Sequence, residues 1–196
     1  MMFTLPNWLT IFRIFLVPFL VVVLLTKMPA REFIGLAIFL LAIITDGLDG
    51  YFARKFKQTS RLGALLDPIA DKFLMTGAFV SLVEIGVVPA WMVVIILGRE
   101  FLLDGLRMTA MDQGLVIAAS RLGKLKTLAQ TVAVCACIIQ FKLDELSRPL
   151  IRIMFNHPVD IFTVLATTFL WIAVILSLGS MVDYFVKFAK VLREKQ

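Results

Sequence analysis

Histidine and cysteine are almost absent from this chain of 196 residues, which contains one histidine and two cysteines. The scarcity excludes a disulfide-rich scaffold and a zinc centre built from these side chains. Cys135 and Cys137 stand two positions apart in an apolar stretch, so on a helix their side chains would point in different directions. We therefore interpret both cysteines as packing residues.

Charged residues are also few, at 17% of the chain, whereas hydrophobic residues make up 60% and the mean hydropathy is +0.94. The basic residues form no solvated run, so no nucleic-acid partner is expected, and the net charge of +6 suits an anionic membrane surface or substrate. Arg13 interrupts the first apolar run, and no basic segment precedes it, which argues against a cleaved signal peptide. We predict an all-α integral membrane protein of one domain, residues 1–196, in a bacterial cytoplasmic membrane.

Six apolar segments are long enough to span a bilayer, which takes about 20 residues each. They run approximately from Trp8 to Thr26, Glu32 to Arg54, Ser60 to Ile85, Val88 to Met111, Gly123 to Phe141 and Val159 to Phe188. The stretch from Lys142 to Val159 is predicted to be a connector.

The flanking basic residues predict the orientation of these segments. One side holds ten of them, Lys55, Lys57, Arg61, Arg121, Lys124, Lys126, Lys187, Lys190, Arg193 and Lys195. The other side holds five, Lys27, Arg31, Lys142, Arg148 and Arg152. The positive-inside rule therefore places both termini in the cytoplasm, together with the connector between the second and third segments.

Four aspartates lie in the second and third segments of this apolar chain. Asp46 and Asp49 are three positions apart, and Asp67 and Asp71 are four apart, so on helices each pair shares one face. An aspartate at the centre of a membrane helix costs about 2.5–3.5 kcal/mol on insertion scales, and such residues usually mark a functional site. Hard cations such as Mg²⁺ or Mn²⁺ prefer carboxylate oxygens. We therefore predict a site for two divalent cations, which could serve an in-line phosphoryl displacement.

Small residues and an arginine accompany the aspartates. Gly50 and Ala53 leave a shallow helix face that a base or pyrophosphate could approach, and Arg54 is placed to pair with a phosphate. One carboxylate could act as a general base toward an acceptor hydroxyl. The structural alternative is that the aspartates form salt bridges with neighbouring basic residues, namely Arg54, Lys55, Arg61 and Lys72.

The pattern Asp46-x-x-Asp49-Gly50-x-x-Ala53-Arg54, eight residues, Gly63-x-x-x-Asp67-x-x-x-Asp71 resembles the complete signature of the CDP-alcohol phosphotransferase family. The resemblance implies a six-helix membrane enzyme, usually a homodimer, in which an acceptor hydroxyl displaces CMP from a CDP-linked donor with the help of two divalent metals. It also implies that the four aspartates bind the metals and that Asp71 is the base. The nucleotide and pyrophosphate would then lie against Gly50, Ala53, Arg54 and Gly63.

A basic cluster lies in the fourth and fifth segments. Arg99 and Arg107 share a helical face, and Lys124 and Lys126 begin the next segment on the same side of the membrane. These side chains could hold a phosphate carried by the acceptor through charge-assisted hydrogen bonds. The structural alternative is that these basic residues form local ion pairs. Arg107 would pair with Asp104, and Glu100 would pair with Arg99 or another partner.

Within the family, the blocks PNWLTIFRIFLVP, DGYFARKF, GALLDPIADK, GREF and GKLKT resemble members that use CDP-diacylglycerol and glycerol 3-phosphate. The implied reaction transfers the phosphatidyl group to the glycerol phosphate hydroxyl and releases CMP. The resemblance also includes Asn7 and Thr10, whose position is equally suited to capping the first helix. The alternatives are the same chemistry with inositol phosphate, serine or phosphatidylglycerol as acceptor, or a divalent-cation transporter.

Overall fold

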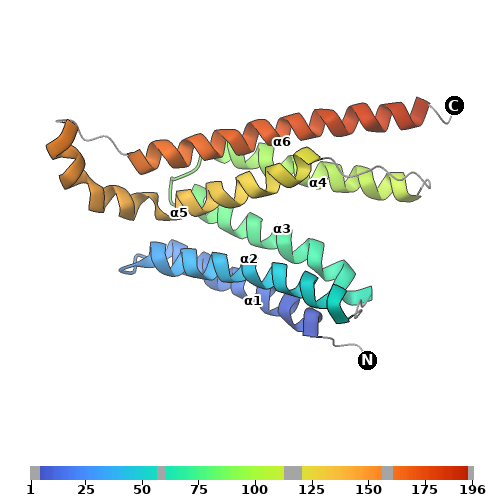
Figure 1. Ribbon diagram of the computed structural model, residues 1–196, viewed down its shortest axis with the longest axis horizontal. Helices are drawn as coiled ribbons and strands as arrows, with labels where there is room; N and C mark the ends of the chain where they lie inside the picture. Colours follow the sequence, from blue (N-terminus) through green and yellow to red (C-terminus); the bar gives the residue numbers. More distant parts are fainter. Residues whose placement is uncertain (1–4, 57–60, 113–120, 156–160, 194–196) are drawn as a thin grey trace. The chain divides into compact units, whose positions relative to one another are not determined.

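The computed structural model of the chain describes residues 5–56, 61–112, 121–155 and 161–193. These ranges contain six α-helices and no β-strand (Figure 1). The helices are α1 (Leu5–Leu25), α2 (Arg31–Phe56), α3 (Arg61–Glu84), α4 (Ala90–Asp112), α5 (Arg121–Phe155) and α6 (Ile161–Arg193). The predicted all-α class and the six predicted helices are therefore confirmed for the described ranges.

Helix α5 is longer than predicted. A connector is expected from Lys142 onward, but the helix continues to Phe155. The prediction ended the helix where the apolar run ends, whereas a helix requires only backbone hydrogen bonds and suitable residues. Eight of the fourteen added residues, 142–155, are leucine, arginine, lysine, glutamate or methionine, which are good helix formers, so the helix extends beyond its apolar part.

The helices form two compact units, one of residues 1–87 and the other of residues 88–196. In the first unit, α1 packs along both α2 and α3. Its buried residues recur every three or four positions and form one stripe, which consists of Asn7, Thr10, Arg13, Val17, Leu20 and Leu24. Its exposed side includes large apolar side chains, among them Trp8, Phe12, Phe15, Phe19 and Val22. Polar groups inside and large apolar groups outside suit a helix in lipid and not one in water.

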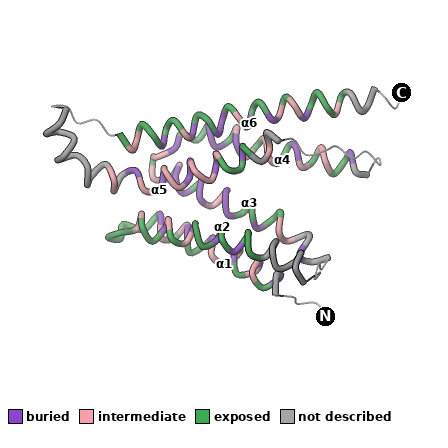
Figure 2. Tube along the Cα trace, viewed as in Figure 1, coloured by how far each residue is buried: buried purple, intermediate pink, exposed green. Residues whose placement is uncertain are grey.

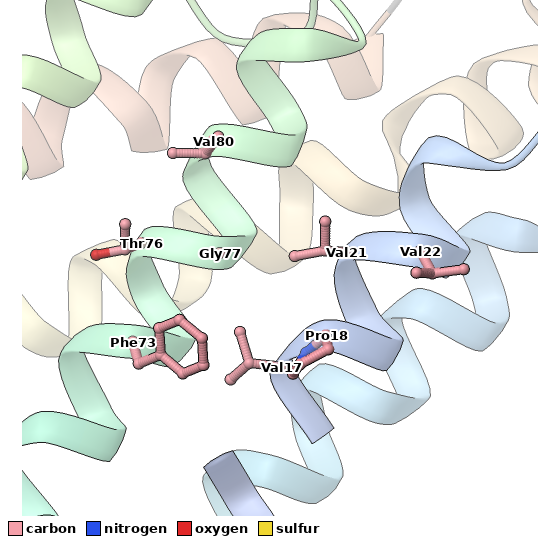
Figure 3. A pocket seen from close by; sticks show the side chains of 8 residues that line it. All are labelled: Val17, Pro18, Val21, Val22, Phe73, Thr76, Gly77 and Val80. Atoms are coloured by element: carbon pink, nitrogen blue, oxygen red, sulfur yellow. The ribbon is translucent and has the colours of Figure 1, made fainter. Parts of the chain in front are cut away.

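Helices α1 and α3 approach closely at Gly77. A Cβ atom at Gly77 would lie 2.6 Å from Cγ1 of Val17 and 3.4 Å from Cγ2 of Val21. A groove of about 340 Å³ lies beside this contact (Figure 3), and it is lined by Val17, Pro18, Val21, Val22, Phe73, Thr76, Gly77 and Val80. On α3, several of these residues stand roughly opposite Asp71 around the helix axis. The groove is therefore separate from the face that carries the aspartates.

We expect Gly77→Ala to destabilise the first unit. The added methyl group would overlap Val17, whose branched side chain has little rotamer freedom in a helix. Such overpacking costs about 1–3 kcal/mol, and the gain of about 1 kcal/mol in helix propensity offsets only part of it. Thermal unfolding in detergent measures the loss, with Gly98→Ala as the control, because nothing lies within 4 Å of a Cβ at Gly98. Equal stability of the two variants would contradict the close approach.

In the second unit, α6 contacts both α5 and α4. Figure 2 shows buried and exposed positions alternating along α6, and the buried ones include a stripe at spacings of four and three. This stripe consists of Ala166, Leu170, Ala173, Ser177, Ser180 and Tyr184. Such spacing is typical of helices that pack at a small crossing angle. The stripe is apolar in its first half and carries hydroxyl groups in its second half.

Within the described residues, two helices are long and apolar enough to cross a membrane. They cover Asn7–Leu25, with 19 residues, and Ile161–Ala189, with 29 residues. Trp91 of α4 packs edge-on against Trp171 inside the second of these stretches, with ring centroids 5.6 Å apart. Two of the six predicted spans are thus supported by length and composition.

Candidate functional site

Thr10 of α1 connects to the second aspartate pair. Its hydroxyl Oγ1 donates a hydrogen bond of 2.6 Å to Oδ1 of Asp67 on α3. Thr10 is buried, whereas Asp67 is partly exposed, so the bond fixes the carboxylate at the edge of the helix packing. A hydroxyl that donates to a carboxylate forms a strong, charge-assisted bond and orients the acceptor.

Arg13 of α1 connects to the first aspartate pair. Its Nη1 atom lies 2.6 Å from Oδ1 of Asp46 on α2, and the arginine side chain is fully buried while that of Asp46 is half-exposed. Arg13 lies three positions after Thr10, so both residues belong to the same buried stripe of α1. One face of α1 therefore holds a carboxylate from each of the two neighbouring helices.

The three aspartates whose side chains are described, Asp46, Asp67 and Asp71, retain the exposure that a polar ligand requires. Asp71 is exposed and lies one helical turn after Asp67 on the same face of α3, and Asp46 is half-exposed. A carboxylate has about four lone-pair sites, so a bond to Arg13 or Thr10 leaves it able to bind a cation as well. The donor set consists of hard oxygen atoms, which fits a divalent cation such as Mg²⁺.

The described side chains do not by themselves complete a metal site. Among them, no group of three or more histidine, cysteine, aspartate or glutamate residues could hold an ion. Asp49, Gly50, Ala53 and Arg54 belong to the backbone of α2, but their side chains lie outside the described part of the structure. The proposed ligand role of Asp49 therefore stays a prediction.

Two further predicted residues lie on the helix faces that carry Thr10 and Asp67. Asn7 is buried one turn before Thr10 in the stripe of α1. Gly63 is buried one turn before Asp67 on α3, so Gly63, Asp67 and Asp71 follow one another at intervals of four. Asn7 thus lies beside Thr10 on α1, and Gly63 lies beside Asp67 on α3, while their roles in the site stay predictions.

Arg13 contacts a predicted metal ligand, Asp46, although the sequence pattern did not single it out as a site residue. Its only role there is to interrupt an apolar run, while the possible salt-bridge partners of the aspartates are sought close by in the sequence. The structure instead pairs Asp46 with an arginine 33 positions earlier in the chain. An ionisable residue inside a membrane helix usually indicates a function or a pairing partner, and the sequence shows Arg13 within the first apolar run.

The basic cluster of the second unit is held by specific contacts. Nζ of Lys126 on α5 lies 2.6 Å from Oε1 of Glu100 on α4, and these side chains are only 6% and 11% exposed. Glu100 thus pairs with Lys126, and the partner of Glu100 that the sequence left open is identified. The side chain of Lys124 lies outside the described residues.

The two arginines of α4 both contact α6. Nη2 of Arg99 donates a hydrogen bond of 2.7 Å to Oγ of Ser180. The guanidinium of Arg107 lies over the ring of Tyr184, 5.5 Å from the centroid, and Nη1 is 3.9 Å from Oδ1 of Asp104. The expected pairing of Arg107 with Asp104 is therefore present, at long distance. The contacts with α6 were not predicted, because they join residues about 80 positions apart.

Comparison with known proteins identifies the family. The family model for CDP-alcohol phosphatidyltransferase matches residues 3–179. The chain belongs to this family. Members of the family generally use divalent metal ions, in keeping with the hard oxygen donors on α2 and α3.

Several bacterial relatives of this phosphatidyltransferase carry the same name, CDP-diacylglycerol–glycerol-3-phosphate 3-phosphatidyltransferase. The one from Bacillus subtilis is 36% identical over an alignment that covers 95% of each chain. The one from Haemophilus influenzae is 37% identical, over 94% of this chain and 92% of its own. The one from Mycoplasma pneumoniae is 36% identical, over 84% and 82%.

Proposed function

We propose that this phosphatidyltransferase moves the phosphatidyl group of CDP-diacylglycerol to sn-glycerol 3-phosphate, which yields phosphatidylglycerophosphate and CMP. The observation that carries the proposal is the similarity, over nearly the full length, to relatives named for these two substrates. The geometry supports it, because two carboxylates from neighbouring helices converge on one face of α1. The basic residues of α4 and α5 supply the charge that a phosphorylated acceptor requires.

The aspartates of α2 and α3 are the proposed metal ligands, namely Asp46, Asp49, Asp67 and Asp71. Two divalent cations, Mg²⁺ or Mn²⁺, would neutralise the pyrophosphate charge and stabilise the leaving group when bound there. Thr10 and Arg13 keep Asp67 and Asp46 in place. Removal of a hydrogen-bond partner that orients a metal ligand typically lowers metal affinity or activity by about 10–100-fold.

Asp71 is the proposed general base. Its exposed carboxylate accepts the proton from the primary hydroxyl of the acceptor, and the hydroxyl oxygen forms a bond to the lipid-side phosphorus. The bond between that phosphorus and the bridging oxygen breaks in line, and CMP leaves with the electron pair. Gly50, Ala53, Arg54 and Gly63 are proposed to line the pocket of the nucleotide and pyrophosphate. Asn7 would help to shape its edge.

The acceptor phosphate is proposed to bind Arg107 and Lys124, with Arg99 and Lys126 nearby.

The proposed membrane architecture is the one that membership of the family implies. We propose that both units form one domain with six membrane spans, that both termini and the site face the cytoplasm, and that the enzyme is a homodimer in the bacterial inner membrane. The exposed apolar side chains along α1 and α6 support a lipid environment for these helices.

An acceptor panel tests the proposed reaction. With purified protein in detergent and CDP-diacylglycerol as donor, we expect CMP release to depend on glycerol 3-phosphate and to stop when a chelator removes divalent cations. Inositol phosphate, serine and phosphatidylglycerol serve as the competing acceptors. Release that requires serine, and is not stimulated by glycerol 3-phosphate, would contradict the assignment.

We expect Thr10→Val to reduce turnover by about 10–100-fold, because the variant removes the bond that orients Asp67 while keeping a similar shape. The concentration of Mg²⁺ required for half-maximal rate should rise as well. Thr26→Val is the matched control, since the exposed Thr26, just beyond the other end of α1, donates to the backbone oxygen of Val22. An unchanged Mg²⁺ requirement in Thr10→Val would show that Thr10 does not contribute to metal binding.

A further inference from the structure

The second half of the buried stripe on α6 contacts the arginines proposed to serve the acceptor. Ser180 accepts a hydrogen bond from Arg99, and one turn later the ring of Tyr184 lies beneath Arg107. Oγ of Ser180 also donates to the backbone oxygen of Ser177, which fixes its orientation. The hydroxyl-bearing half of the buried stripe on α6 therefore coincides with the cationic part of α4.

Tyr184 contributes two separate chemical groups at this place. Its aromatic face attracts the guanidinium of Arg107 through a cation–π interaction, which limits the directions that this half-exposed side chain can take. Its hydroxyl is a hydrogen-bond donor. Both groups belong to a side chain that is in contact with Arg107.

The hydroxyl of Tyr184 lacks a partner of its own. The residue is 4% exposed, and its oxygen is buried with no hydrogen-bond partner in the described part of the chain. Buried tyrosine hydroxyls normally have a partner, because leaving one unsatisfied is costly. Ser177 shares this property but lies two turns before Tyr184, away from the contact with Arg107.

We propose that Tyr184 is an acceptor-binding residue. Its ring positions Arg107, and its hydroxyl donates a hydrogen bond to a phosphate oxygen of glycerol 3-phosphate. The inference rests on the proposed function, since it concerns the acceptor of that reaction. It explains why a polar side chain lies in a buried stripe that could hold leucine, and it adds a recognition element from α6 to those of α4 and α5.

The test compares Tyr184→Phe with Ser177→Ala in the full-length enzyme. Each variant removes one buried hydroxyl of α6 that has no partner in the described residues, and the phenylalanine keeps the ring beneath Arg107. We expect Tyr184→Phe to raise the KM for glycerol 3-phosphate by about tenfold or more, as for the loss of a hydrogen bond to a charged group. The KM for CDP-diacylglycerol and the unfolding temperature should stay the same. Ser177→Ala should change none of these values.

Inorganic phosphate provides a second measurement. As a competitor of glycerol 3-phosphate it should inhibit Tyr184→Phe more weakly than the unmodified enzyme, by a similar factor. An unchanged KM and inhibition constant in Tyr184→Phe, or an equal change in Ser177→Ala, would overturn the inference. If the unmodified enzyme does not require glycerol 3-phosphate at all, the proposed function fails instead, and the acceptor panel reveals this before any variant is measured.

Discussion

Asp71→Asn is expected to lower the rate of CMP release by about 10²–10⁴-fold, which is the contribution of a positioned general base. Asparagine has nearly the same shape as aspartate, so the packing of α3 should be preserved. It cannot accept the proton of the acceptor hydroxyl, and it is a poor ligand for a hard cation. The rate is measured at saturating concentrations of both substrates, so that a change in binding does not hide the change in chemistry.

Asp67→Asn separates the ligand role from the base role. The amide oxygen can still accept the hydrogen bond of Thr10, so the link between α1 and α3 should survive. If Asp67 is a ligand only, higher Mn²⁺ or Mg²⁺ concentrations should restore part of the activity of Asp67→Asn. Additional metal should restore much less in Asp71→Asn, because the missing group there also takes the proton.

The matched control for both variants is Glu84→Gln. Glu84 is an exposed acidic residue that ends the same helix, α3, well beyond the aspartates. Its variant should keep full activity and stability. Turnover that persists in both Asp67→Asn and Asp71→Asn, with Glu84→Gln unaffected, would contradict the proposed metal and base sites together.

The helices could be predicted because each apolar run is limited by polar or breaking residues. The end of α5 could not be predicted, because the criterion was the thickness of a bilayer, whereas the helix continues past the apolar run to Phe155. Helical spacing also predicted which residues share a face, such as Asp67 with Asp71 and Asp104 with Arg107. Such spacing describes a single helix only.

The contacts between helices could not be predicted from the sequence and were found only in the structure. Helical spacing does not tell which helix packs against a given face, so the Arg13–Asp46 and Arg107–Tyr184 contacts were not predicted. Both contacts join residues that are far apart in the sequence, and no local pattern links them. The buried position of Arg13 was still detectable in principle, since an arginine within an apolar segment requires a partner.

Loss of one partner from the buried ion pair of Glu100 and Lys126 is expected to have the second large effect, a loss of stability. The two side chains are 11% and 6% exposed and their charged atoms are 2.6 Å apart. Removal of one partner from a buried ion pair leaves an uncompensated charge and costs about 3–5 kcal/mol. We therefore expect Glu100→Met to unfold at a markedly lower temperature than the unmodified enzyme. Lys126→Met should be destabilised in the same way.

The double variant Glu100→Met/Lys126→Met distinguishes a structural pair from an acceptor site. Replacement of both charges by apolar side chains is often neutral or stabilising, so the stability lost in either single variant should return. The affinity for glycerol 3-phosphate should not return if Lys126 binds the acceptor phosphate, and its KM should stay about tenfold or more above that of the unmodified enzyme. Lys187→Met, which removes an exposed lysine paired with Asp183 on α6, controls for the loss of a positive charge. Recovery of both stability and KM in the double variant would show that the pair only holds α4 to α5, and the acceptor phosphate would then depend on Arg107 and Lys124.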